Sequence, residues 1–147
     1  MDNHVHILVK SGPDGIGDFI KRLSNSYVYY FNNKYKRVGH LFQGRFKSEP
    51  VETESYFLAL VRYIHRNPVK AGLVSRCEDY PYSSFREYQK KDSQVKTNIA
   101  LSILGKKGFL EFHNIITNDA CLEIQDTYIW RLTDREAISI IQSILSY

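Results

Sequence analysis

"MDNHVHILVK" (residues 1–10) opens the chain and decides how we interpret its fold. Its valine, isoleucine and leucine residues favour a β-strand over residues 3–10. The next five residues, "SGPDG" (11–15), are typical of a turn, because glycine and proline interrupt regular structure. Residues two apart in a strand point to the same side, so His4 and His6 are predicted to share one face.

Beyond the turn, the apolar pattern changes to the period of a helix, which predicts a helix over residues 16–33. Its apolar positions are Ile16, Phe19, Ile20, Leu23, Tyr27, Tyr30 and Phe31. Residues 40–52 are expected to be extended, with a bulge or close approach at Gly44.

A second helix is predicted over residues 53–67, with Thr53 as its N-cap. Its apolar stripe contains Phe57, Leu60, Val61 and Ile64. We expect Pro68 to end it, because the residue before a proline disfavours helical geometry.

The polar stretch "QKKDSQ" (89–94) follows a short predicted helix at 83–90 and is interpreted as a boundary between a domain at 1–91 and a domain at 92–147. The second part is expected to be helical. Its predicted helices cover 95–104, 108–117 and a last segment from the capping pattern "TDRE" (133–136) to about residue 146.

Charge is distributed unevenly along the 147 residues. Residues 1–91 contain 15 Lys and Arg against 9 Asp and Glu, whereas residues 92–147 contain 5 against 7. The basic part is the predicted nucleic-acid face, although proteins that bind no nucleic acid also carry such a surplus. No membrane span or signal peptide is apparent, and Cys77 and Cys121 have no metal-ligand spacing, so we expect reduced thiols in a cytoplasmic protein.

Two imidazoles on one strand face suit a divalent cation, so His4 and His6 are candidate ligands that need a third from elsewhere. The alternative is that they are ordinary polar surface. Lone histidines elsewhere are interpreted as structural or exposed. We expect His65 to lie at the surface and His113 to have no partner.

Tyr63 and Asn67 are four residues apart in the predicted helix and therefore lie on one face. Hard divalent ions accept amide oxygens, and a phenol near such an ion is able to attack a phosphodiester. The alternative is a half-buried tyrosine and an asparagine that merely precedes the end of the helix.

Four motifs occur in order: "NHVHILV" (3–9), "GHLFQGRFKS" (39–48), "YIHRNPVKAGLV" (63–74) and "YPYSSFREY" (80–88). Together they resemble the HUH-type tyrosine transposases of small insertion sequences, and most closely the REP-associated branch, over about residues 1–90. The resemblance implies an α+β, ferredoxin-like transposase domain, an antiparallel sheet with helices on one face. The tail is similar to the helical C-terminal extension of part of that branch.

The resemblance also implies roles for individual residues. His4, His6 and Asn67 match the ligands of Mg²⁺ or Mn²⁺, and Tyr63 matches the nucleophile that forms a 5′-phosphotyrosine bond with single-stranded DNA. Arg45 lies in a family motif beside the active site and is expected to contact DNA. The other candidate DNA-binding residues, which could equally form a solvated charged face, are Arg37, Lys47, Arg62, Arg66 and Lys70.

The resemblance predicts a metal-dependent enzyme that cleaves and rejoins single-stranded DNA near hairpins. The alternative is an inactive remnant that at most binds structured single-stranded DNA; a replication-initiator or relaxase type of nickase fits the "NPVKAGLV" context less well. Relatives carry a strand–helix–strand segment before the histidine strand, so the chain is interpreted as N-terminally incomplete. We expect a homodimer through the exposed strand edge, or a weakly stable monomer.

Overall fold

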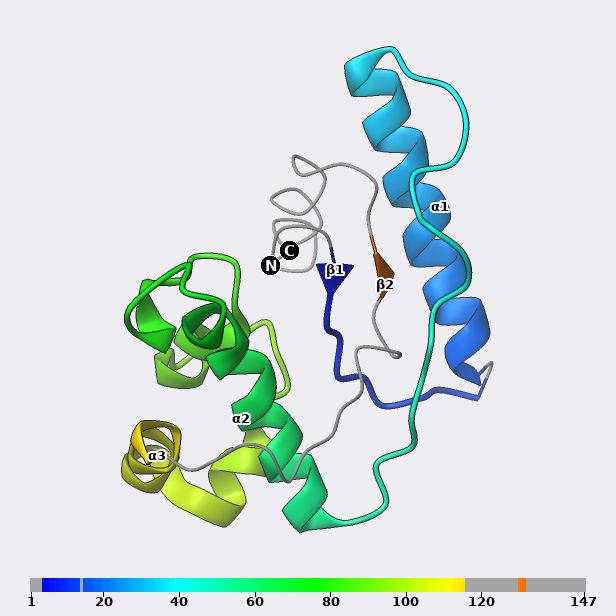
Figure 1. The fold of residues 1–147 in the computed structure, drawn as a ribbon. Helices are drawn as coiled ribbons and strands as arrows, with labels where there is room; N and C mark the ends of the chain where they lie inside the picture. Colours follow the sequence, from blue (N-terminus) through cyan, green and yellow to red (C-terminus); the bar gives the residue numbers. More distant parts are fainter. Residues whose placement is uncertain (1–3, 14, 116–129, 132–147) are drawn as a thin grey trace. The chain divides into compact units, whose positions relative to one another are not determined.

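The computed structural model describes residues 4–13, 15–115 and 130–131 (Figure 1). They fall into two compact units. Within the described residues, the first unit is 50–115, and the second consists of 4–13, 15–49 and 130–131.

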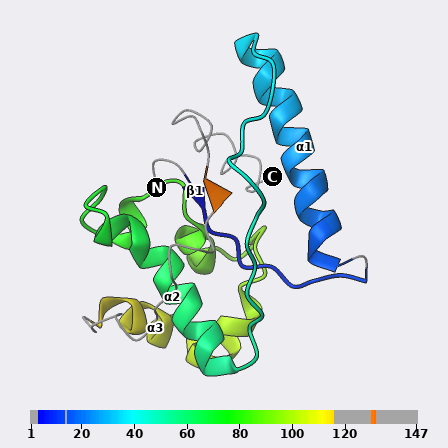
Figure 2. The same ribbon diagram turned by 45° about the vertical axis from the view of Figure 1, so that its right-hand side comes forward.

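The second unit contains two short strands that lie side by side in both views (Figures 1 and 2). β1 (His4–Val5) pairs antiparallel with β2 (Trp130–Arg131), and His4 lies opposite Arg131. The predicted strand at 3–10 is therefore confirmed only at its start, since residues 6–10 have no strand assignment. The ferredoxin-like sheet stays a prediction.

α1 (Gly15–Tyr35) confirms the helix predicted over residues 16–33. It buries Ile20, Tyr27 and Phe31, which are spaced seven and four residues apart on one face. Phe19 and Tyr30, which were predicted to lie on this apolar stripe, are instead 42% and 43% exposed.

After α1 the chain reverses and runs back along the helix (Figures 1 and 2). The reversal places Lys36 and Gly39 at positive φ, and the Asn32 side-chain amide donates to the Gly39 carbonyl at 2.9 Å. Residues 40–52 have no helix, as predicted, and Gly44 adopts φ 77°. The core of this unit consists of Val5, Tyr27, Phe31 and Leu41.

In the first unit, α2 (Glu54–Lys70) begins where predicted. The Thr53 hydroxyl accepts from the Tyr56 backbone N–H at 3.2 Å, which confirms the N-cap. The predicted end was wrong, because α2 continues through Pro68 to Lys70. Asn67 and Pro68 are both buried. Pro68 has no N–H, but it lies in the last turn of α2, so the helix loses little hydrogen bonding there. Packing therefore outweighs the local preference against helix before a proline.

Two 3₁₀ helices and one α-helix follow: η1 (Cys77–Asp79), η2 (Ser84–Gln89) and α3 (Asn98–Asn114). η2 matches the short helix predicted at 83–90. α3 changes direction at Gly105, which has φ 66° and separates two arms (Figure 1). The arms match the helices predicted at 95–104 and 108–117, whereas the last predicted helix lies outside the described residues.

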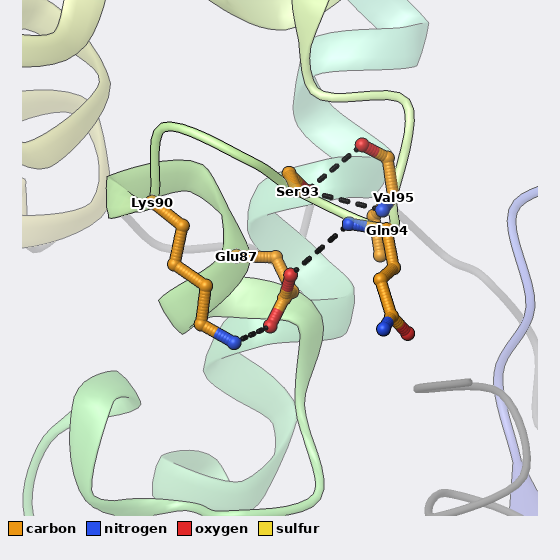
Figure 3. Close-up of polar contacts among 5 residues, drawn as sticks. All are labelled: Glu87, Lys90, Ser93, Gln94 and Val95. Carbon is orange, nitrogen blue, oxygen red and sulfur yellow. Dashed lines mark hydrogen bonds and ion pairs between the residues drawn. The ribbon is translucent and has the colours of Figure 1, made fainter.

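The link from η2 to α3 is held by polar contacts (Figure 3). The Glu87 carboxylate binds the Lys90 ammonium and accepts from the Gln94 backbone N–H at 3.3 Å. The hydrogen bond from Lys90 holds the pKa of Glu87 below its usual range. Ser93 exchanges two hydrogen bonds with the backbone of Val95.

The core of the first unit contains side chains from both sides of this link: Val61, Phe85, Tyr88, Ala100 and Phe109. Tyr88 and Phe109 stack with ring centroids 4.3 Å apart and nearly parallel planes. The division into domains at 1–91 and 92–147 stays a prediction, and residues from both of these ranges share this core. Among the described residues, no helix is long and apolar enough to cross a bilayer.

Candidate functional site

The side chains of His4, in β1, and of His6, just after it, lie next to each other, as the predicted shared face requires. Val5 between them is buried in the core of its unit, whereas both histidines are partly exposed. Their ring centroids are 5.0 Å apart and their planes are perpendicular. Two imidazoles at this separation fit adjacent positions around one divalent cation, which is the donor chemistry that the prediction requires.

Tyr63 and Asn67 both lie on α2, one helical turn apart. Tyr63 is partly buried, and Asn67 is buried with 9% of its surface exposed. The structure brings His4 close to His6, and Tyr63 close to Asn67. The two pairs belong to different units, so their convergence stays a prediction. In the described part of the chain, no three His, Cys, Asp or Glu side chains cluster around a possible ion; an asparagine ligand lies outside those types.

The candidate DNA-binding residues differ in exposure. Arg37, Arg45, Lys47 and Lys70 are exposed. Arg62 and Arg66 are partly buried and contact α3. The Arg62 guanidinium lies over the Phe112 ring, 4.8 Å from its centroid, and Arg66 donates to the carbonyls of His113 and Ile115 at 3.1 and 2.7 Å.

His65 is where the structure departs furthest from the sequence analysis. It was predicted to lie at the surface, but it is 2% exposed. Its Nδ1 lies 3.0 Å from Nε2 of His113, and its Nε2 lies 2.9 Å from the Ser84 hydroxyl. His113, which was predicted to have no partner, is 3% exposed and completes this buried chain. Both predictions were wrong, because η2 and α3 cover this side of α2.

The direction of the hydrogen bonds follows from the chemistry of the groups. Burial lowers the pKa of His65 to about 3, and burial lowers that of His113 to about 4, so both rings are neutral near pH 7. The Phe109 carbonyl only accepts, so Nδ1 of His113 donates to it at 2.8 Å and Nε2 of His113 accepts from His65. Nε2 of His65 then accepts from the Ser84 hydroxyl.

The order serine–histidine–histidine has the form of a nucleophile, a base and an orienting group. A buried imidazole with a pKa of about 3 is too weak a base to activate a serine near neutral pH. The chain therefore satisfies buried polar groups and joins three elements of the fold, namely α2, η2 and α3.

Cys77 is a free, partly buried thiol, and the reduced state of the thiols stays a prediction. Cys121 lies outside the described residues. The sequence offered no signal for the pairing of His65 with His113, since 48 residues separate them.

Comparison with known proteins identifies the class of the chain. Residues 1–67 match the family model described as "Transposase IS200 like". The match supports a DNA-processing enzyme in general. Over these residues the chain is similar to the IS200-like transposases, which confirms the predicted resemblance to a tyrosine-transposase-like family. No curated protein and no solved structure matched the chain.

The matched region contains every predicted catalytic and metal-binding residue, from His4 to Asn67. It ends one residue before Pro68. η1, η2 and α3 lie beyond it, and so do His113 and Ser84, the two partners of His65.

Proposed function

We propose that the protein cleaves and rejoins single-stranded DNA near hairpins through a 5′-phosphotyrosine intermediate. The observation that carries this proposal is the IS200-like match, which spans the histidine pair and the Tyr63–Asn67 pair. The close approach of the two imidazoles and the i, i+4 spacing of Tyr63 and Asn67 on α2 support it.

His4, His6 and Asn67 are the proposed ligands of Mg²⁺ or Mn²⁺. Imidazole nitrogens and an amide oxygen suit such an ion. The ring of His4, in β1, and the ring of His6, the residue after β1, are already adjacent. When bound, the ion polarises the scissile phosphodiester.

Tyr63 is the proposed nucleophile. Its phenolic oxygen forms a bond to phosphorus while the bond from phosphorus to the 3′ oxygen breaks, and the departing strand takes a proton to leave as a 3′-OH. The phosphotyrosine link retains the phosphodiester for a later rejoining step, so no nucleotide hydrolysis is needed. A helix is a rigid support for such a group, and Tyr63 lies in the middle of α2.

The proposed DNA contacts are the basic side chains. Residues 15–47 contain seven Lys and Arg and one Asp, and Arg37, Arg45 and Lys47 within them are exposed. Tyr29 on α1 is 74% exposed, and an exposed aromatic ring suits stacking with an unpaired base. The ferredoxin-like sheet and a homodimer are part of the same proposal.

The test is a covalent-adduct assay with labelled hairpin DNA carrying a single-stranded flank, in the presence of Mn²⁺. On a denaturing gel the parent is expected to form a protein–DNA adduct, and Tyr63→Phe is expected to form none. The variant should bind the hairpin within about twofold of the parent, because affinity comes from basic and stacking contacts rather than from one hydroxyl.

Tyr82→Phe is the matched control, since it removes a phenol from the same unit outside the proposed site. It should form the adduct as the parent does. An adduct of equal yield in Tyr63→Phe contradicts the assignment of the nucleophile, and hairpin binding without any adduct in the parent favours the non-catalytic DNA-binding alternative.

A further inference from the structure

The last turn of α3 docks on the part of α2 that carries Tyr63. Three side chains of α2 make the contact: Arg62 over the Phe112 ring, His65 to the His113 ring, and Arg66 to the carbonyls at the end of α3. Arg62 directly precedes Tyr63 in the chain, and His65 follows it by two residues. The contacts with α3 and the proposed nucleophile therefore occupy the same helical turn.

The hydrogen bonds among these contacts give partners to polar groups at the end of α3. The final carbonyls of a helix lack helical partners, and the Arg66 guanidinium donates to that of His113 and also to the carbonyl of Ile115, the residue that follows α3. The His113 ring uses both nitrogens, one for the Phe109 carbonyl and one for His65. Buried groups that are fully hydrogen-bonded in this way specify one arrangement of two helices and disfavour others.

The geometry of α2 links this docking to Tyr63. Residues two apart in a helix are about 200° apart around its axis, so His65 and Tyr63 point to nearly opposite sides. Holding His65 against α3 and η2 fixes the rotation of α2 about its axis, and that rotation sets where the Tyr63 phenol points. An error of about an ångström in the position of a reacting group costs roughly a hundredfold in rate.

We propose that His113, in the last turn of α3, is a positioning residue that sets the orientation of Tyr63 through its hydrogen bond with His65. The inference rests on the proposed role of Tyr63 as nucleophile. It assigns a function to a helix beyond the family match: α3 serves the site without touching DNA.

Two variants of His113 separate the hydrogen bond from the bulk of the ring. His113→Phe keeps a ring of similar size but removes the acceptor for His65. His113→Gln places an amide oxygen where Nε2 accepts and restores that acceptor. In single-turnover adduct formation with hairpin DNA and Mn²⁺, His113→Phe is expected to be at least about tenfold slower than the parent, with hairpin affinity within about twofold. His113→Gln is expected to recover to within about threefold.

A second measurement does not depend on activity. With 3-fluorotyrosine incorporated at position 63, the parent and His113→Gln should each give one narrow ¹⁹F resonance. His113→Phe should give a broadened or split resonance, because α2 then has more than one rotation. Circular dichroism of each variant establishes that the protein is folded.

The outcomes separate this inference from the proposed function. If the parent forms no adduct, the proposed function fails, and the ¹⁹F spectra alone decide whether His113 orients Tyr63. Equal rates and identical spectra for the parent and His113→Phe overturn the inference. Equal losses in His113→Phe and His113→Gln also overturn it, because the hydrogen bond is then not what matters.

Discussion

At the scale of single residues, His65 shows how burial decides what a histidine does. Its ring lies among Phe85, Tyr88 and Phe109, and its two nitrogens bond to Ser84 and His113. A buried imidazole without such partners would be strongly unfavourable. The same burial that makes the ring useful as an anchor removes it as a base near neutral pH.

The first prediction at this scale concerns acid. The pKa of His113 is lowered to about 4, chiefly by burial and further by the Arg62 and Arg66 cations. The unfolded chain therefore binds more protons than the folded chain between about pH 6.5 and 4. The stabilisation is complete above about pH 6.5 and is lost as pH falls through that window. His65, with its lowered pKa, adds in the same direction.

The measurement is urea unfolding of the parent and His113→Gln at about pH 7.5 and 5.5. Between these values the free energy of unfolding of the parent should fall by about 1 kcal/mol more than that of His113→Gln, which lacks this titrating group. An identical fall in both proteins contradicts the lowered pKa.

At the scale of elements, α2 and α3 show local preference yielding to packing. α2 passes through Pro68 because Asn67 and Pro68 are buried. α3 turns at Gly105, where the positive φ of 66° suits glycine and lets the second arm bring Phe109 and His113 onto α2. Ile103 and Leu110 of α3 are 41% and 39% exposed, whereas Ala100 and Phe109 are buried, so within the described residues the helix is covered unevenly.

The prediction at this scale compares neighbouring residues of α3. Phe109 is 1% exposed and packs in the core of its unit, so Phe109→Ala should lower the free energy of unfolding by about 3–5 kcal/mol. Leu110→Ala, next to it on the exposed side, should cost less than about 1 kcal/mol. Chemical denaturation measures both, and similar costs for the two variants would be inconsistent with the core described here.

At the scale of the whole molecule, the surplus of positive charge and the core of the first unit are distributed differently along the chain. The surplus of Lys and Arg lies in residues 1–91, whereas the core of the first unit contains residues from both sides of the predicted boundary at 91 and 92. A DNA strand is therefore expected to contact the first part of the chain, while residues such as Phe109 and His113 in the later part support α2.

The prediction at this scale is a salt dependence. Hairpin binding should weaken as salt rises, and replacing Arg45 by Gln should reduce the slope of log K against log salt by about 0.7 for one lost phosphate contact on a single strand. Lys106→Gln, an exposed lysine of α3, is the control and should leave the slope unchanged. Fluorescence anisotropy at several salt concentrations gives the slopes, and equal slopes for the parent and Arg45→Gln exclude that contact.

The sequence alone determined the features that depend on near neighbours. The helical stripe of α1, the Thr53 cap, the two arms of α3 and the shared face of His4 and His6 all follow from periods of two or about four residues. The motifs also identified the family that the match over residues 1–67 confirms.

Tertiary structure alone decided the rest, because the deciding partners are far away in the chain. The length of β1 depends on its pairing with β2 at Trp130–Arg131. No local sequence pattern predicts which residues of the two strands lie opposite each other. The burial of His65 depends on Ser84 and His113, 19 and 48 residues away. Periodicity shows that one side of a helix differs from the other, but only the packed chain determines which polar side chain is buried and what satisfies its hydrogen bonds.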